Sequence, residues 1–417
     1  MSKANPAVSV IIPNYNHAQY IHDAITSVLN QRYRNFEVIV VDDGSTDNSR
    51  DVVAQFGDQV KYIYKQNAGL SAARNTGIEQ AQGTFIGLLD ADDMYEPDFM
   101  NTLVPILYSD SDAEAAYCGY QFVDEANQPL PQKEARSIPP ADLFQVLAEG
   151  NFLVPESILV RKRCYQKVGL FDLNLRACED VDMWLRISRQ YKVLGVTNLL
   201  TRHRILPNSM STDPSRQTEN RLAVMRKHFG SKPLHESDWI ESQRRAYGQA
   251  YLASSIEYLQ ARMYDRAYES FYHMAVVSPL SLTQLNTYYE LGCGEQPKGY
   301  RGDFASLNLN ASSQNLMKML NQLFLQIGKQ KGYRQIRNEA YSQANMALGL
   351  LYYGARRFSR ARKLMLRAAI YNGSLLFNRR FATTFVKSFI DAGVIEMYHK
   401  RRRQSESVRL SSFGSKS

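Results

Sequence analysis

Residues 8–16 read VSVIIPNYN, residues 36–48 read FEVIVVDDGSTDN, and residues 84–93 read TFIGLLDADD. Each segment is a short apolar run that ends abruptly in polar residues, which is typical of a strand buried on both faces. Further strands are predicted at residues 60–64, 115–123 and 191–197, with helices at residues 20–29, 70–81 and 179–189. This alternation predicts an α/β fold with a mostly parallel sheet.

Three polar clusters follow directly on these strands, at residues 13–16, 42–45 and 90–93. In an open α/β sheet, ligands bind beyond the carboxyl ends of the strands, so we expect the clusters to meet at one site. A turn with Gly and Asp is ordinary after any single strand, but three clusters, two of them with paired carboxylates, indicate a binding site. Carboxylates without nearby His or Cys favour a hard divalent cation, Mg²⁺ or Mn²⁺, that also grips substrate phosphates. No Gly-x-Gly-x-x-Gly turn or phosphate-binding loop follows any strand, which argues against a dinucleotide enzyme or a P-loop NTPase.

Length and composition indicate two globular domains in a reducing compartment. The chain has 417 residues, of which 44% are hydrophobic and 22% charged, and one domain usually has about 100–200 residues. No apolar run is long enough to span a bilayer, and no signal peptide is evident. The four cysteines have no metal-ligand spacing, so a cytoplasmic protein is the simplest interpretation.

The second half of the chain differs from the first in pattern and in charge. Residues 1–230 hold 23 Lys and Arg against 28 Asp and Glu, whereas residues 231–417 hold 27 against 13. Beyond residue 230 the pattern is nearly all helical, and a weak repeat of about 94 residues resembles tetratricopeptide helix hairpins. The repeat aligns Ala253, Tyr258, Arg262 and Ala267 with Ala347, Tyr352, Arg356 and Ala361. We therefore predict a catalytic domain at residues 1–230, a helical, tetratricopeptide-like domain at 231–405, and a disordered tail at 406–417.

Five motifs together resemble glycosyltransferase family 2, the inverting transferases of GT-A fold. They are VSVIIPNYN, VVDDGSTDNS, NAGLSAARNTGI, LLDADD and GLFD…ACEDVDMWLRI, and they cover roughly residues 7–230. The resemblance implies transfer of a sugar from a nucleotide diphosphate donor, commonly UDP-linked, to an acceptor hydroxyl with inversion. It also implies a role in polysaccharide or glycan biosynthesis, with acceptors that are often lipid-linked glycans.

The resemblance assigns roles in donor binding to six residues. Pro13 and Tyr15 match positions that line the base pocket, and Asp43 matches the residue that bonds the uracil or its ribose. Arg74 stands where an arginine approaches the base and phosphates. Asp90 and Asp92 match the two carboxylates of the Asp-x-Asp motif, the first near the ribose and the second a ligand of Mn²⁺ or Mg²⁺.

Asp180 stands in the place of the family's catalytic base, after Glu179. Inversion is a direct displacement, so the acceptor hydroxyl must lose its proton as it attacks, and a carboxylate can accept that proton. Asp182 is the local rival. Residues two apart on a helix point about 200° away from each other, so both cannot face one pocket. A cap of the helix is the structural alternative for Asp180.

One position departs from the family pattern. Before Pro207 the family usually has Tyr-Arg-x-His, whereas this chain has His203, Arg204, Ile205 and Leu206. Leu206 replaces the histidine that reaches the metal in some members, which puts the metal affinity or the ordering of this loop in question. For His203, packing in the loop is favoured over metal ligation. The chain also lacks the Gln-x-x-Arg-Trp pattern of processive members, which favours a single sugar added per encounter.

The basic run at residues 398–403 follows an apolar stretch from Phe377 to Ile395. One interpretation is that this run is a charged face exposed to solvent. The other is that it binds the anionic inner surface of a membrane, since aromatic and basic side chains suit such an interface. Nucleic acid is not expected, because no nucleic-acid module accompanies the charge.

The sequence leaves two other functions as alternatives. A non-catalytic helical scaffold with a retired transferase domain would tend to lose its carboxylates, yet all of them are present. A metal-dependent nucleotidyltransferase would leave Asp180 without a clear task.

Overall fold

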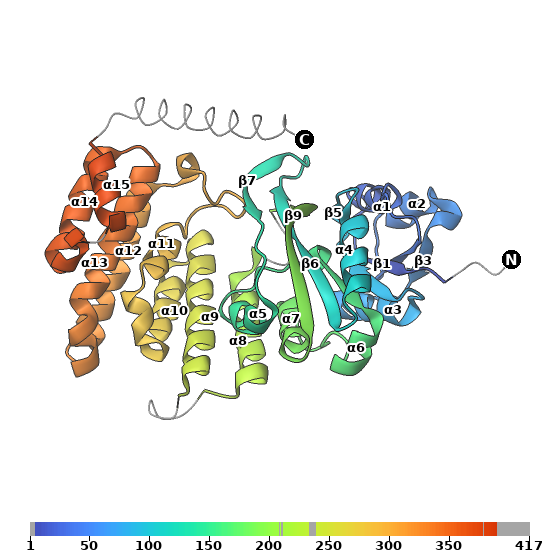
Figure 1. Cartoon of the computed structure of the whole chain (residues 1–417), viewed down its shortest axis with the longest axis horizontal. Helices are drawn as coiled ribbons and strands as arrows, with labels where there is room; N and C mark the ends of the chain where they lie inside the picture. The colour runs from blue at the N-terminus through green and yellow to red at the C-terminus, as the bar shows by residue number, and fades with distance from the viewer. Residues whose placement is uncertain (1–4, 208, 210–211, 233–238, 378, 390–417) are drawn as a thin grey trace, which may run out of the picture. The chain divides into compact units, whose positions relative to one another are not determined.

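The chain is described by a computed structural model that covers residues 5–207, 209, 212–232, 239–377 and 379–389. It divides into two compact units (Figure 1). The first takes in Met1–Ala261 and Pro297–Asp303, and the second takes in Arg262–Gln296 and Phe304–Ser417. The first unit therefore extends beyond the predicted boundary at residue 230 and includes the helix at Glu241–Gln260. The apolar pattern of a helix does not tell which unit its buried face packs against.

Nine strands among the described residues form one sheet in the first unit. Its order is β3-β2-β1-β4-β8-β6-β9-β5, and β7 pairs with β6. The strands are β1 (Val8–Asn14), β2 (Phe36–Asp42), β3 (Lys61–Tyr64), β4 (Phe85–Leu88), β5 (Met94–Tyr95), β6 (Ala113–Val123), β7 (Pro129–Glu134), β8 (Ile158–Arg161) and β9 (Lys192–Arg204).

The sheet is mixed, whereas the sequence predicted a mostly parallel one. Strands β3, β2, β1 and β4 are parallel, as is the pair β6–β9. Strand β8 runs antiparallel to both β4 and β6, and β5 and β7 also pair in antiparallel fashion. The strands missed by the sequence, β5, β7 and β8, are those that make the antiparallel pairs. Strand β5 has only two residues and β7 (PLPQKE) has few apolar residues, so neither shows the hydrophobic pattern of a strand.

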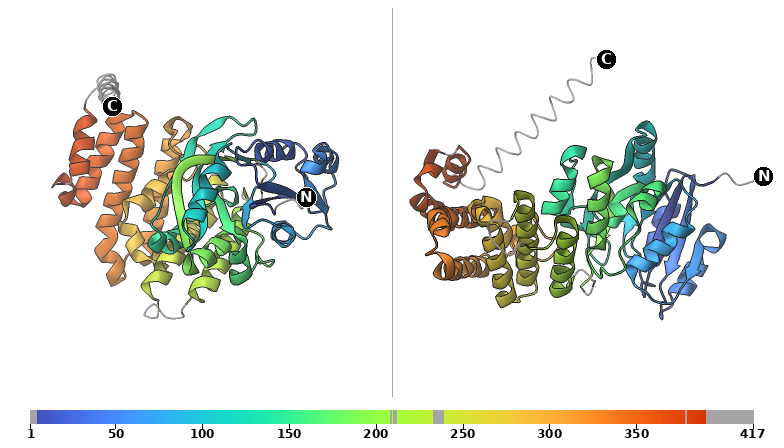
Figure 2. Two further views of the ribbon diagram at one scale, coloured as in Figure 1. Left: turned by 45° about the vertical axis from the view of Figure 1, so that its right-hand side comes forward. Right: turned by 90° about the horizontal axis from the view of Figure 1, so that it is seen from below.

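Helices cover both faces of the parallel part of the sheet (Figure 2). Val8, Val10 and Ile12 pack in one core with α1 and α4. Ile11 points to the other face, where a Cβ at Gly77 of α3 would overlap it. This alternation places hydrophobic side chains on both faces of β1. The helices of this unit are α1 (Ile21–Leu29), α2 (Ser49–Ala54), α3 (Leu70–Gln80), α4 (Phe99–Ser109), α5 (Pro140–Glu149), α6 (Lys162–Val168), α7 (Glu179–Gln190), α8 (Pro214–Phe229) and α9 (Glu241–Gln260).

The described part of the second unit is helical, as predicted. It contains α10 (Tyr264–Val277), α11 (Leu285–Gly292), α12 (Leu309–Ile327), α13 (Lys331–Gly354), α14 (Phe358–Tyr371) and α15 (Arg379–Lys387). The two copies of the predicted repeat share the geometry of one turn. Arg262 (φ 58°) and Arg356 (φ 59°), which the repeat aligns, both adopt the left-handed conformation between consecutive helices. The aligned Ala267 and Ala361 are both fully buried.

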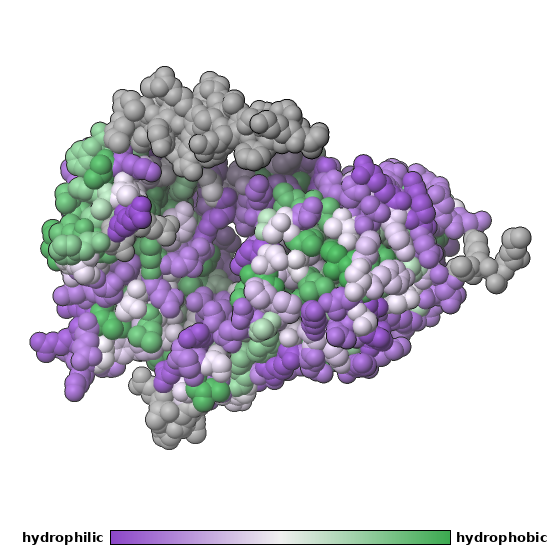
Figure 3. All heavy atoms as spheres, viewed as in Figure 1, coloured by the Kyte–Doolittle hydropathy of each residue, from purple (hydrophilic) through white to green (hydrophobic). Residues whose placement is uncertain are grey.

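Hydrophobic side chains gather on the surface over α14 (Figure 3). Within the described ranges, no helix is both long enough and apolar enough to cross a membrane. The predicted basic run at residues 398–403 and the predicted tail lie outside the described residues.

Candidate active site

The carboxyl ends of β1, β2 and β4 meet at one edge of the sheet, where a pocket of about 1350 Å³ opens. The register sets this edge, because Asn14 pairs with Asp42 and Ile11 pairs with Leu88. The structure brings every residue of the predicted site into the lining of this pocket: Pro13, Tyr15, Asp43, Arg74, Asp90, Asp92 and Asp180. The volume exceeds the roughly 300–1000 Å³ of common ligand pockets, which leaves space for two substrates.

The loops after β1 and β2 hold each other through short polar side chains. Asn16 adopts φ 56°, and its Oδ1 accepts a hydrogen bond from the backbone N–H of Thr46 at 2.7 Å. The hydroxyl of Ser45 accepts hydrogen bonds from the side chain of Asn14 and from the backbone N–H of Asn16. Asn tolerates this left-handed conformation better than most residues. The two loops therefore form one preorganised wall beside Tyr15.

Asp43 is buried and already hydrogen-bonded within the protein. Its carboxylate accepts from Lys65 Nζ at 2.6 Å and from the backbone N–H groups of Ala68 and Gly69. A carboxylate offers about four lone-pair positions, so three donors leave it room for about one more hydrogen bond. Asp43 thus ties the loop before α3 to the end of β2 and can still accept from one ligand N–H or O–H.

Arg74 is fully buried and joins the two acidic motifs. Its Nη2 donates to both oxygens of Asp90, at 2.7 and 2.9 Å, and its Nη1 donates to Glu179 Oε1 at 2.6 Å. Burial lowers the pKa of Arg74, but these two carboxylates outweigh burial and hold the pKa above its usual value. The sequence predicted a contact with base and phosphates, whereas the guanidinium here is engaged with protein carboxylates.

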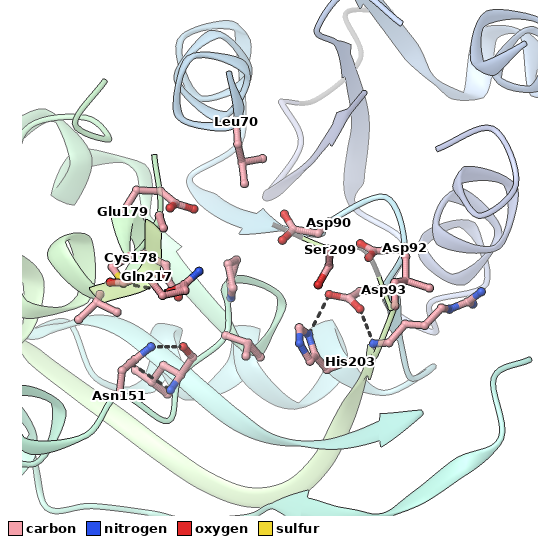
Figure 4. Close-up of a pocket in the computed structure, with 18 of the residues that line it drawn as sticks. Leu70, Asp90, Asp92, Asp93, Asn151, Cys178, Glu179, His203, Ser209 and Gln217 are labelled. Atoms are coloured by element: carbon pink, nitrogen blue, oxygen red, sulfur yellow. Dashed lines mark hydrogen bonds and ion pairs between the residues drawn. The ribbon is translucent and has the colours of Figure 1, made fainter. Parts of the chain in front are cut away.

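Asp90, Asp92 and Asp93 lie together on one side of the pocket (Figure 4). Burial raises the pKa of Asp92, and the negative charges of Asp93 and Asp90 raise it further. A divalent cation would relieve this repulsion, and carboxylate oxygens are the ligands that Mg²⁺ and Mn²⁺ prefer. The residues present therefore fit such an ion, with Asp92 facing the pocket to hold it.

Asp93 belongs to a buried network with Glu156 and His203. His203 Nδ1 lies 3.1 Å from Asp93 Oδ2 and 2.8 Å from Glu156 Oε1, and Asp93 Oδ1 accepts from the backbone N–H of Arg204 at 2.7 Å. Burial lowers the pKa of His203, but both carboxylates hold it well above its usual value. These three side chains also have ligand atoms within 4.8 Å of one another, so they could hold a metal ion themselves. Leu206 lines the pocket, where the family pattern has a histidine.

Asp180 and Asp182 separate as the helix geometry predicted. Cys178 adopts the left-handed conformation (φ 57°) where α7 begins, and Asp180 then lines the pocket. Burial and the charge of Glu179 raise the pKa of Asp180 to about 7, against the opposing effect of Arg74. Asp182 is completely buried outside the pocket lining and is bonded to Arg186, Lys227 and His228. The rival carboxylate is therefore engaged elsewhere.

The sequence missed the far side of the pocket. Gln217 and Arg221 of α8 and Glu257 of α9 line it, together with residues 147–155 and Lys298. Figure 4 shows Asn151, Cys178 and Gln217 on the side opposite the aspartates. No local motif marks these residues, because a long-range fold alone brings helices and loops of different parts of the chain to one wall.

Comparison with known proteins places the chain among glycosyltransferases. The model of the family "Glycosyl transferase family 2" matches residues 9–169. Uncharacterized glycosyltransferases of Rickettsia prowazekii and Rickettsia typhi are each 36% identical to the chain, over 48% and 52% of its length. The matches span 64% and 67% of these relatives, so the chain corresponds to about two thirds of each.

Two further likenesses are more distant. A Bacillus subtilis protein, named as a candidate teichuronic acid biosynthesis glycosyltransferase, is 28% identical over 51% of this chain and 84% of its own. The solved structure of S. aureus TarS (residues 1–349) superimposes with a TM-score of 0.49 and 17% identity, over 81% of this chain and 91% of that one. The family model and the Rickettsia relatives agree with the motifs and with their arrangement around one pocket. The chain belongs to glycosyltransferase family 2.

Proposed function

We propose that the chain transfers a sugar from a nucleoside diphosphate donor, of the UDP type, to an acceptor hydroxyl with inversion at the anomeric carbon. The observation that carries this proposal is the position of Asp180 in the same pocket as the Asp90–Asp92 cluster. A carboxylate with a pKa near neutrality can accept the proton that the acceptor hydroxyl loses in a direct displacement, and a bound cation would stabilise the charge on the leaving diphosphate. The size of the pocket supports simultaneous binding of donor and acceptor.

The chain's own residues divide the work between the two ends of the pocket. Pro13 and Tyr15 flank the space for the base, and Asp43 accepts from the base or its ribose. Asp90 is held in place by Arg74 and lies beside the ribose. Asp92 would hold Mn²⁺ or Mg²⁺, which would supply positive charge for the departing diphosphate. Asp180 orients the acceptor hydroxyl and accepts its proton as the new glycosidic bond forms.

A role in polysaccharide or glycan biosynthesis follows as the biological context of this activity. The name of the B. subtilis relative supports it, as that protein is named for the synthesis of a cell-wall polymer. We propose a glycan or lipid-linked acceptor and a cytoplasmic location, which agrees with four cysteines that are all unpaired. The helical unit would serve as a tetratricopeptide-like module, and its matching turns at Arg262 and Arg356 support that assignment.

We further propose that the protein associates peripherally with an anionic membrane through the outer face of α14. Lys363, Leu366, Arg367 and Ile370 recur at helical spacing on this face and are all exposed. Leu376 and Phe377, in the short 3-10 helix that follows α14, are also exposed, Phe377 by 92%. Residues 340–390 contain nine Lys and Arg and no Asp or Glu. Apolar and basic side chains on one face suit a lipid interface, whereas Phe381 of the predicted anchor is buried in the helical core.

A screen of nucleotide sugars tests the proposed activity. The purified 417-residue chain is incubated with UDP-, GDP- and dTDP-linked sugars, with Mn²⁺ or with a chelator, and release of the nucleoside diphosphate is measured. We expect slow, metal-dependent hydrolysis of a UDP-sugar. A retired transferase, which is the competing function, would hydrolyse and bind no nucleotide sugar under any of these conditions.

A further inference from the structure

Three side chains from separate parts of the chain meet next to Asp92. Asp93 directly precedes β5, Glu156 lies in the short 3-10 helix Pro155–Ser157, and His203 is on β9. One ligand atom of each lies within 4.8 Å of the ligand atoms of the other two. This group, the His203 cluster, is the only one of its kind among the residues that the structure describes, and it does not include Asp92.

The backbone holds the members of the His203 cluster in fixed positions. Strand β5 pairs with β9, and Asp93 Oδ1 accepts a hydrogen bond from the backbone N–H of Arg204 at 2.7 Å. His203 pairs with Phe122 in the register of β6 and β9, and the two rings pack edge to face with their centroids 5.5 Å apart. Binding sites built on strands hold their ligands more precisely than sites on loops do. The ligand atoms are therefore in place before an ion arrives.

Two carboxylates of the His203 cluster share one ring nitrogen. His203 Nδ1 lies 2.8 Å from Glu156 Oε1 and 3.1 Å from Asp93 Oδ2, and it carries at most one proton. Both carboxylates are buried, and within the described ranges His203 is the only basic side chain that forms an ion pair with either of them. Even an imidazolium would leave one of the two negative charges without a partner. A buried charge without a partner is unfavourable.

The second oxygen of Glu156 has no hydrogen-bond partner. Glu156 is completely buried, and its Oε2 receives no donor from any described residue. Buried polar atoms are nearly always hydrogen-bonded, and an exception calls for an explanation such as a bound ion. A carboxylate can bind a cation through one oxygen or through both. The unpartnered oxygen is thus a second indication, independent of the spacing, that the cluster receives a cation.

The spacing of the ligand atoms suits a small divalent ion. Zn²⁺ lies about 2.0–2.2 Å from nitrogen and oxygen ligands, so two ligands of a tetrahedral site lie about 3.4 Å apart. The two carboxylates would therefore retreat from His203 by only roughly 0.3–0.6 Å when an ion replaces the proton on Nδ1. A doubly charged ion, two carboxylates and a neutral imidazole also have no net charge, which removes the imbalance in the buried cluster.

We infer that Asp93, Glu156 and His203 form a second cation site, for an ion of the Zn²⁺ type, in addition to the Mn²⁺ or Mg²⁺ site proposed at Asp92. An imidazole ligand suits Zn²⁺, whereas Mg²⁺ prefers oxygen ligands. Asp93 and His203 line the pocket and lie side by side in Figure 4. We therefore expect the fourth position of the ion to face the pocket and to take water or a substrate oxygen, as in zinc sites with three protein ligands.

Metal titrations of the purified, tag-free chain, without nucleotide, test this site. Calorimetry measures the affinity for Zn²⁺, alone and in excess Mg²⁺. Visible absorption follows the binding of Co²⁺, which replaces Zn²⁺ in four-coordinate sites and then absorbs strongly. The variants are His203→Gln and Glu156→Gln. His22→Gln is the matched control, because His22 is exposed and lies 3.9 Å from Asp23, outside the pocket lining.

We expect the wild type to bind one Zn²⁺ with an affinity that excess Mg²⁺ does not reduce. His203→Gln and Glu156→Gln should each weaken Zn²⁺ binding by more than about a hundredfold, since the loss of an outer-shell partner alone costs about 10–100-fold. Both variants should lose the Co²⁺ absorption, and His22→Gln should match the wild type. A wild type that binds no Zn²⁺, or that releases it to Mg²⁺, would overturn the inference whether or not the variants fold.

Asp92→Asn separates this site from the one proposed for the donor, and it should still bind one Zn²⁺. Loss of Zn²⁺ binding in Asp92→Asn with unchanged binding in His203→Gln would place the ion at Asp92 and overturn the inference. The inference does not depend on the proposed sugar transfer, because its test uses no nucleotide. A protein that binds Zn²⁺ in the expected pattern and binds no nucleoside diphosphate would contradict the transfer and still support the second cation site.

Discussion

Asp180 and Asp182 lie two residues apart on α7 and occupy opposite electrostatic environments. Asp180 faces the pocket beside Glu179, and its pKa is raised to about 7. Asp182 is bonded on the other side to Arg186, Lys227 and His228, and its pKa falls to about 2, because these partners outweigh the effect of burial. One helix thus carries a carboxylate suited to accept a proton and another suited to hold the helix in place.

Substitution of Asp180 tests the proposed base. Only the ionised carboxylate can accept a proton, so transfer by the wild type should rise with pH and level off above about 7. Asp180→Asn should lose this pH dependence and reduce transfer about 10²–10⁴-fold, the usual contribution of a positioned base. Donor binding, measured by calorimetry, should be retained. Transfer close to the wild-type rate would remove Asp180 from the mechanism.

Substitution of Asp182 is the matched control in the same helix, and we expect it to change the stability of the protein. Its folded-state pKa of about 2 lies below the usual 3.9, which contributes roughly 2.6 kcal/mol at neutral pH. A depressed pKa gives stability that is present above pH 4 and is lost as the pH falls through 2. Asp182→Asn should therefore be less stable at pH 7 and lose less stability than the wild type on acidification.

Urea denaturation followed by tryptophan fluorescence measures this effect, because Trp184 lies buried in α7 itself. At pH values where Asp182→Asn is folded, its rate of sugar transfer should depend on pH with the same midpoint as that of the wild type. An unfolding free energy that is equal in the two proteins between pH 3 and pH 7 would show that the network around Asp182 contributes nothing.

Asp92→Asn tests the cation site. Replacement of one carboxylate by an amide removes the negative charge that a hard cation requires. Loss of an outer-shell partner already costs about 10–100-fold in metal affinity, so loss of a ligand should exceed that range. The Mn²⁺-dependent part of UDP binding should therefore disappear, while binding in the presence of a chelator stays unchanged. Asp112 is exposed and directly precedes β6, so Asp112→Asn serves as the control. Unchanged metal-dependent affinity would exclude Asp92 as the ligand.

The sequence predicted which carboxylates gather on the strand-end side of this pocket, because strand order and side-chain type suffice there. Asp43, Asp90 and Asp92 each follow an apolar strand, and parallel strands bring such positions to one edge of the sheet. Asp180 needed the family resemblance, since it follows a loop between two helices, α6 and α7, and no rule of this kind applies there. Helix periodicity predicted only that Asp180 and Asp182 cannot both face the pocket, and the choice of Asp180 came from the resemblance.

Other features depend on contacts between distant segments that no local pattern encodes. Arg74 and Glu179 are 105 residues apart, and no local pattern predicts the ion pair that joins them. Strand β8 enters between β4 and β6 in the antiparallel direction, which a run of four residues cannot reveal. Lys298 reaches the pocket only because its loop docks on β7.

The outer face of α14 should bind anionic lipid bilayers. Lys363→Gln combined with Arg367→Gln removes two basic side chains, each worth about 1 kcal/mol near such a surface, so binding should weaken about 30-fold. Leu366→Gln combined with Ile370→Gln should also weaken binding, because both side chains are exposed and would enter the interface. Co-sedimentation with vesicles of neutral lipid, with and without added phosphatidylglycerol, measures both effects.

Salt and a charge-matched variant separate a specific surface from general basicity. Binding should decrease at high salt, because screening shortens the range of the attraction to the lipid surface. Lys329→Gln combined with Lys331→Gln removes the same charge from exposed positions elsewhere in the helical unit and should sediment as the wild type does. Donor hydrolysis should be equal in all variants, since none of these residues lines the pocket. Equal sedimentation of the wild type with and without phosphatidylglycerol would exclude the membrane and leave α14 as a surface for a protein partner.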